Sequence, residues 1–209
     1  MTKRIMLLLA LTVQSAWAIV NWVAKTDPAQ NDIANLDNWP AAIATDKAIQ
    51  FNHLNAAAPE LWMGQDAAFD RMVLNGTNLV FNLGAGRTLS LGQGGETKLN
   101  WANTHVCLIS GTIRQTAHWL NIGQEKNNTN CAFIVDGPTA RYLAPGLPVN
   151  LGSASNTMHC ALGVYNGGSV DGNFYIGNHG FSSGNILDAS GAETTLWSTN
   201  GAACYVGNS

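Results

Sequence analysis

The segment CAFIVDG at residues 131–137 recurs 29 residues later as CALGVYNG at residues 160–167, and each copy follows an Asn-Thr pair. Apolar residues alternate with other residues in both copies, which is typical of a β-strand with one buried face. The closing glycine allows a tight turn with a positive φ angle. A strand and turn that return after a fixed interval indicate stacked repeats of one supersecondary unit.

Two short patterns run through the rest of the chain in a fixed order. The first is apolar-x-apolar-Gly, whose glycines are 31, 29, 25 and 30 residues apart, and it occurs at Leu89–Gly92, Leu120–Gly123, Val149–Gly152, Phe174–Gly177 and Cys204–Gly207. The second is a β-rich run that closes on glycine, and it occurs at Met72–Gly76, Cys107–Gly111, Phe133–Gly137, Leu162–Gly167 and Leu187–Gly191. A unit of this length cannot bury its own apolar face, but stacked units can, as in a solenoid.

The repeat predicts an all-β fold, a right-handed parallel β-helix, because parallel crossovers are nearly always right-handed. One predicted core ladder contains Leu91, Ile122, Leu151, Ile176 and Val206. A second face is predicted to be lined by Phe133, Leu162 and Leu187, together with Val135, Val164 and Ala189. A β-sandwich also explains the alternation, but it does not require two patterns in the same order in every unit.

Three parts are expected along the chain. Residues 1–18 have a basic start, an apolar run and small residues before Ala18, which predicts a secretory signal peptide cleaved between Ala18 and Ile19. Residues 19–60 lack the repeat and are expected to form an N-terminal capping segment. Residues 61–209 are expected to form the coils, incomplete at the C-terminal end, so that the chain is a fragment or stacks end to end through its last coil.

The opening of the capping segment resembles a known family. Trp22, Asn38-Trp39-Pro40 and the run at residues 46–51, followed by the five apolar-x-apolar-Gly copies, are similar to secreted bacterial proteins with autotransporter-associated β-strand repeats. The resemblance implies a pectin-lyase-like right-handed β-helix, export and often surface display. It implies no fixed catalytic residues.

The amino-acid composition and the hydropathy pattern exclude some classes of function. Only 11% of the residues are charged, against about 25% in ordinary globular proteins. Such a chain has no basic footprint for nucleic acid, and no later segment is apolar enough to span a membrane. With a cleaved signal peptide, the expected location is secreted or at the cell surface.

Candidate chemistry is sparse. Cys131 and Cys160 occupy equivalent places in adjacent coils, where they form either a buried stack of thiols or a disulfide. The carboxylates Asp136, Asp171 and Asp188 fall in different parts of their coils. No cofactor and no metal site is predicted.

Tyr175 and Tyr205 occupy the outward position of the first pattern in successive coils. They form either a contact stripe for a polysaccharide or a ladder that stabilises the sheet. The sequence favours a non-enzymatic β-solenoid that acts as a structural, adhesive or passenger module, with polysaccharide or cell-surface and matrix components as candidate partners. The alternative is a carbohydrate-active or carbohydrate-binding β-helix protein, resembling a polysaccharide lyase or glycosidase.

Overall fold

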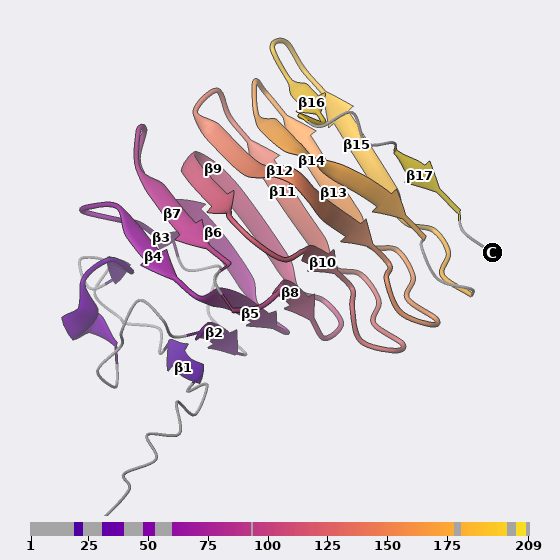
Figure 1. Ribbon diagram of the computed structural model, residues 1–209, viewed down its shortest axis with the longest axis horizontal. Helices are drawn as coiled ribbons and strands as arrows, with labels where there is room; N and C mark the ends of the chain where they lie inside the picture. The colour runs from indigo at the N-terminus through magenta and orange to yellow at the C-terminus, as the bar shows by residue number, and fades with distance from the viewer. Residues whose placement is uncertain are drawn as a thin grey trace, which may run out of the picture.

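The chain folds into a β-solenoid of about five turns that is nearly all parallel β-sheet (Figure 1). The structure, a computed structural model, describes residues 19–22, 31–39, 48–52, 60–92, 94–177, 181–199 and 204–207. The predicted signal peptide at residues 1–18 lies outside these residues. The prediction of a parallel β-helix is confirmed.

Strand pairing groups the strands into three stacks, which we name the first, second and third face. The first face contains β1 (Ile19–Trp22), β2 (Ala48–Asn52), β5 (Arg71–Asn75), β8 (Thr97–Asn100), β10 (Leu120–Ile122), the second halves of β12 (Ala140–Leu151) and β14 (Ser169–Ile176), and β17 (Tyr205–Val206). The second face contains β3 (Glu60–Leu61), β6 (Asn78–Asn82), the first half of β9 (His105–Gln115), β11 (Ala132–Asp136), β13 (Ala161–Tyr165) and β15 (Ile186–Ser190). The third face contains β4 (Ala67–Phe69), β7 (Thr88–Leu91), the remaining halves of β9, β12 and β14, and β16 (Thr195–Trp197).

Each face sends at least one ladder of apolar side chains into the core, and on the second face Val135, Val164 and Ala189 pair in register as a further ladder. On the first face the ladder runs through Phe51, Leu74, Leu99, Ile122, Leu151, Ile176 and Val206. On the second face Phe133 pairs with Leu162, and Leu162 with Leu187, as predicted. Most members of these ladders are buried, whereas Val206 in the last described strand is 73% exposed.

Two of the predicted repeat copies belong to other faces than expected. Leu91 pairs with Phe69 and Gln115 on the third face, so its place in the predicted ladder is taken by Leu99. Residues 72–76 belong to the first face, because Leu74 pairs with Phe51 and Leu99. The prediction was wrong at these copies because strands on all three faces alternate apolar residues in the same way.

The third face was not predicted at all. Its core ladder consists of Ala67, Leu89, Ile113, Tyr142, Val170 and Leu196. Tyr142 is fully buried, and its ring lies edge-on to Phe133 with the centroids 5.3 Å apart. The core is therefore enclosed by three sheets.

The N-terminal end of the core is covered by residues 31–39. Trp39 is buried, and its ring contacts the rings of Trp22, Phe51 and Phe69 at centroid distances of 4.7 to 6.2 Å. Its indole Nε1–H donates to the carbonyl of Ile33 at 3.1 Å. The contact with Trp22 is edge-on and the other two are tilted, and aromatic contacts of this kind are favourable beyond the area that they bury.

Within residues 19–60, however, β1 and β2 already continue the first face, since Trp22 pairs with Phe51 and Phe51 with Leu74. The prediction that this stretch lies outside the repeat was therefore wrong for 19–22 and 48–52. Of the described residues, the cap proper is 31–39, which includes the short 3-10 helix η2 (Leu36–Asn38).

Candidate functional site

The outward side chains of the first face form a single column that brings several candidate residues together. In register, Lys98 on β8 lies next to Asn121 on β10, Asn121 next to Asn150 on β12, Asn150 next to Tyr175 on β14, and Tyr175 next to Tyr205 on β17. We call these five residues the outer column. Neighbouring strands in a sheet are about 4.8 Å apart, so each side chain can contact the next.

The C-terminal end of the outer column is the tyrosine pair that the sequence analysis considered. The rings of Tyr175 and Tyr205 are stacked, with centroids 5.0 Å apart and planes 10° apart. One face of each ring is therefore covered by the other ring, and the second face of Tyr175 is turned toward Asn150 in the neighbouring strand. Because the two rings contact each other rather than lying side by side as a flat platform, this arrangement favours a ladder that stabilises the sheet.

The N-terminal end of the outer column, at Lys98, contains a charged cluster that sequence reasoning missed. Glu96 Oε2 lies 3.2 Å from Lys98 Nζ and accepts hydrogen bonds from Asn121 Nδ2 at 3.1 Å and Gln124 Nε2 at 2.7 Å. Asn150 Nδ2 in turn donates to Asn121 Oδ1 at 2.8 Å. One carboxylate oxygen thus contacts an amine and two amides from two consecutive coils.

Burial differs across this cluster. Asn121 and Asn150 are buried, with 1% and 4% of their surface exposed, although both point outward from the sheet. The side chains of Lys98 and Glu96 are 27% and 26% exposed. The amides are thus shielded from water, while the ion pair faces the solvent in part.

The outward side of the second face contains the carboxylates that the sequence considered. Tyr165 pairs in register with Asp136, and its hydroxyl donates to Asp188 at 3.0 Å. Desolvation and the hydrogen bond to Asp188 raise the pKa of the Tyr165 phenol. Asp188 itself pairs in register with Gly163 rather than with Asp136, while the charges of both carboxylates also raise the pKa of the Tyr165 phenol between them.

Beside them lies a shallow apolar groove of about 220 Å³, lined by Asn78, Leu79, Val80, His105, Val106, Cys107 and Ile134. Burial and the nearby carboxylate of Asp136 raise the pKa of the Cys107 thiol. The groove therefore holds a protonated thiol among apolar side chains and offers no activated nucleophile.

Cys131 and Cys160 lie one above the other at the turn before β11 and β13. Both are fully buried, and the structure holds both as free thiols. The Cys131 thiol donates to the carbonyl of Trp101 at 3.1 Å. Its hydrogen bond with Cys160 and its burial raise the pKa of Cys131. Of the two alternatives, the structure contains the thiol stack.

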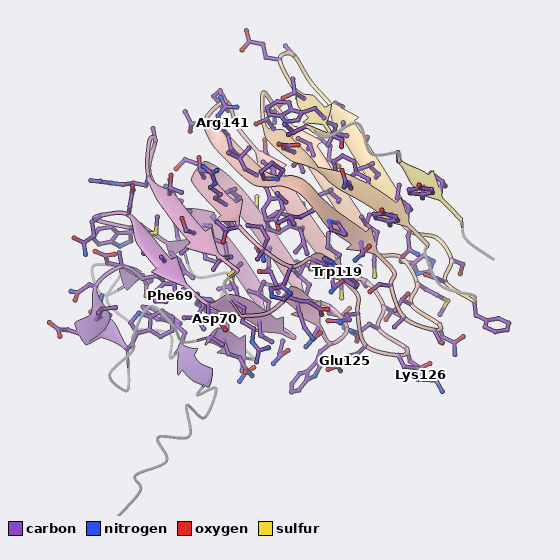
Figure 2. All side chains as sticks on the ribbon, in the orientation of Figure 1. Phe69, Asp70, Trp119, Glu125, Lys126 and Arg141 are labelled. Carbon is purple, nitrogen blue, oxygen red and sulfur yellow. The ribbon has the colours of Figure 1, made fainter. Side chains whose placement is uncertain are left out.

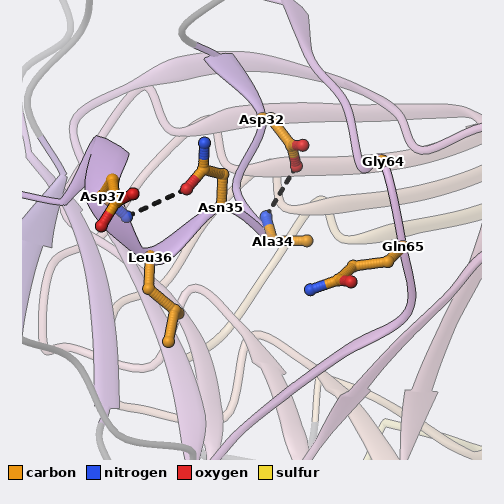
Figure 3. A pocket seen from close by; sticks show the side chains of 7 residues that line it. All are labelled: Asp32, Ala34, Asn35, Leu36, Asp37, Gly64 and Gln65. Carbon is orange, nitrogen blue, oxygen red and sulfur yellow. Dashed lines mark hydrogen bonds between the residues drawn. The ribbon is translucent and has the colours of Figure 1, made fainter.

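A polar hollow of about 390 Å³ lies beside the N-terminal cap, lined by Asp32, Ala34, Asn35, Leu36, Asp37, Gly64 and Gln65 (Figure 3). Asp32 Oδ1 accepts a hydrogen bond from the amide of Ala34 at 2.9 Å, and Asn35 Oδ1 accepts one from the amide of Asp37 at 3.1 Å. The Asn35 oxygen caps η2 and the Asp32 oxygen holds the turn just before it, so the polar groups of the hollow serve the segment that carries Trp39.

Other exposed charges are far apart. Glu125 and Lys126 lie at one end of the strands and Arg141 at the other (Figure 2). Arg141 Nη1 donates to Ser169 Oγ at 2.8 Å. In the described part of the chain, no group of three or more His, Cys, Asp or Glu residues is placed to hold a metal ion. Among the same residues, no helix has the length and apolarity to cross a membrane.

Comparisons of the chain with protein-family models, curated proteins and solved structures find no match. The resemblance to proteins with autotransporter-associated repeats therefore stays a prediction.

Proposed function

We propose that this protein is a non-enzymatic β-solenoid, secreted or displayed at the cell surface, that acts as a structural, adhesive or passenger module. The observation that carries the proposal is the use of its carboxylates. Each of a set of acidic side chains accepts a hydrogen bond from a residue 22 to 30 positions away, in the neighbouring coil: Glu60 from Asn82, Asp66 from Thr88, Glu96 from Asn121, Asp136 from Asn166, Asp171 from Thr199 and Asp188 from Tyr165.

These hydrogen bonds tie neighbouring coils together through carboxylates that could otherwise act on a substrate. A general acid or base needs its proton-transfer atom within hydrogen-bond reach of the substrate. Here a hydroxyl, an amide side chain or a backbone N–H of the next coil occupies carboxylate oxygens. Each net hydrogen bond contributes about 1 kcal/mol, so the ties add to the stability of the stack. This use of the carboxylates supports a structural β-solenoid more than a polysaccharide lyase or glycosidase.

The proposed location follows from the predicted signal peptide at residues 1–18. Its test is a fractionation of the cells that produce the protein, combined with protease treatment of intact cells. The proposal expects a protein whose N-terminus is Ile19, found in the medium or degraded by external protease, while a cytoplasmic marker stays intact. A protein that keeps Met1 and is found only in the cytoplasm would overturn it.

The adhesive part of the proposal concerns polysaccharide or other cell-surface and matrix components. Exposed aromatic and apolar side chains at coil corners supply contact groups; Phe181, Trp119 and Met158 are 86%, 48% and 38% exposed. Binding of the purified protein to immobilised polysaccharides and matrix proteins tests this part, with Phe181→Ser as the variant expected to bind less. Binding that is unchanged in this variant would remove Phe181 from the contact surface.

A further inference from the structure

The geometry points to a covalent cross-link between two consecutive coils, an isopeptide bond between Lys98 Nζ and Asn121 Cγ, formed with Glu96 as the proton-transfer group. A lysine amine can displace ammonia from an asparagine carboxamide when a carboxyl group serves both. The charged cluster at the N-terminal end of the outer column supplies the amine, the carboxamide and the carboxyl group. This inference does not rest on the proposed function, because it concerns the chemistry of one cluster within the folded chain.

The nucleophile and the electrophile are neighbours by strand register. Lys98 and Asn121 are paired residues on β8 and β10 and both point outward, so their Cα atoms are about 4.8 Å apart. The flexible lysine side chain is long enough to span this distance. Glu96 Oε2 lies 3.2 Å from the lysine nitrogen and 3.1 Å from the amide nitrogen of Asn121. Both atoms that exchange protons in the reaction therefore contact the same oxygen.

The carboxamide of Asn121 is held from both sides. Its nitrogen, which would leave, donates to Glu96, and its oxygen accepts a hydrogen bond from Asn150 Nδ2 at 2.8 Å. When the carbonyl carbon is attacked, negative charge develops on this oxygen, and a donor already in place stabilises it. Asn121 is 1% exposed, so water competes poorly with the lysine for the same carbon.

The reaction balances without another reactant. Lys98 first transfers a proton to Glu96, and the neutral amine attacks Asn121 Cγ to form the C–N bond. Glu96 returns the proton to Asn121 Nδ2 and accepts the second proton of the lysine nitrogen. The Cγ–Nδ2 bond then breaks, and ammonia leaves with the proton from Glu96 as ammonium. Overall, an ammonium group and a carboxamide become a secondary amide and an ammonium ion, with no change in oxidation state.

Intact mass and peptide mapping of the full purified protein test the proposal. The cross-link lowers the mass by one ammonia and protects Lys98 from trypsin. Peptides 88–114 and 115–126 then appear as one branched species, whose fragmentation places the link between Lys98 and Asn121. A protein of full mass that yields peptides 88–98 and 99–114 after prolonged incubation overturns the proposal, and so does a link to Gln124.

Variants separate the roles. Lys98→Arg keeps the positive charge and Glu96→Gln keeps the shape, but each abolishes the branched peptide. Asn150→Ala slows its formation. Asn156→Ala is the matched control, because Asn156 donates to Asn127 in another ladder of amides, and it retains the cross-link. A branched peptide that persists in Lys98→Arg contradicts the assignment. Loss of the link lowers the Tm of Lys98→Arg by about 10 °C, from the chain entropy of one closed coil.

Discussion

The ring of Tyr175 lies flat against the ring of Tyr205 in the next coil, with centroids 5.0 Å apart. This stack continues the column in which Asn150 donates to Asn121 and Asn121 donates to Glu96. The outward side of the first face thus uses aromatic, amide and charged groups for the same purpose, contact between consecutive coils. Stacked identical residues act as ladders that fix strand register.

The tyrosine stack is expected to contribute to stability rather than to sugar binding. A double-mutant cycle of Tyr175→Ala and Tyr205→Ala, measured by urea denaturation, should give a coupling free energy of about 0.5 kcal/mol, at the low end for aromatic pairs because both rings are partly exposed. Binding to a polysaccharide panel should be the same in the double variant. Lost binding with no coupling energy would instead make the pair a contact stripe.

The indole of Trp39 closes the N-terminal end of the core, so its removal should be costly. Trp39→Ala should lower the free energy of unfolding by about 3 to 5 kcal/mol, as for other buried large aromatic residues. Trp119→Ala serves as the control, since this indole is 48% exposed, and should change stability by about 0.5 kcal/mol. Equal effects in urea denaturation would show that Trp39 does not cap the core.

Position 123 requires glycine because of its backbone conformation and because of the close packing around it. Its φ is 75°, and an added Cβ would lie 2.3 Å from Cys160 Sγ. Gly86 has a φ of 81°, but no atom lies within 4 Å of its added Cβ. Gly86→Ala should cost about 1 kcal/mol of backbone strain, and Gly123→Ala about 2 kcal/mol more. Similar unfolding free energies for the two variants would contradict close packing at the cysteine stack.

Tyr142 carries a buried hydroxyl with no hydrogen-bond partner among the described residues. Tyr142→Phe keeps the edge-on contact with Phe133 and removes this unpaired group, so it should raise the free energy of unfolding by about 1 kcal/mol at pH 7. Urea denaturation measures the change. A loss of stability would reveal a partner for the hydroxyl.

The buried hydroxyl of Tyr142 also predicts that the free energy of unfolding falls at alkaline pH. Burial raises the pKa of Tyr142 far above its usual range, so the folded state keeps the proton at pH values where the unfolded state releases it. The stability that depends on this proton is complete below about pH 10, the unfolded pKa, and falls by about 1.4 kcal/mol per pH unit above it. In Tyr142→Phe, the loss of unfolding free energy above pH 10 should be smaller by this amount. If the free energy of unfolding falls with pH equally steeply in the variant and the wild type, Tyr142 is not the source of the loss.

The sequence predicted the fold where adjacent repeats keep the same residue types. Cys131 and Cys160, and the strands that follow them, were aligned correctly because they match over a whole coil. The alignment failed at Leu91, because a strand of any face shows the same alternation of apolar residues. To distinguish the faces, one must know which residues pair in register. These partners are 20 to 30 positions apart, such as Glu60 with Val80 and Ile176 with Val206.

The charged cluster was missed for a related reason. Residues 97–100 begin with Thr97 instead of an apolar residue and end in Asn100 instead of glycine, so they did not match the pattern that identifies the first face. With Lys98 outside the alignment, its position next to Asn121 could not be recognised. A search that accepts threonine at the first position and asparagine at the last would have found it, because a small polar residue can also lie at a buried position of a strand, as Thr97 does.

The central claim is that the outward carboxylates tie the coils together and do not cleave a substrate. The most direct test is the release of reducing or unsaturated ends from a polysaccharide panel, measured for the wild type and for Asp171→Asn and Asp188→Asn. The account predicts that all three proteins release no more product than heat-denatured protein does. Turnover by the wild type that disappears in either variant would contradict it.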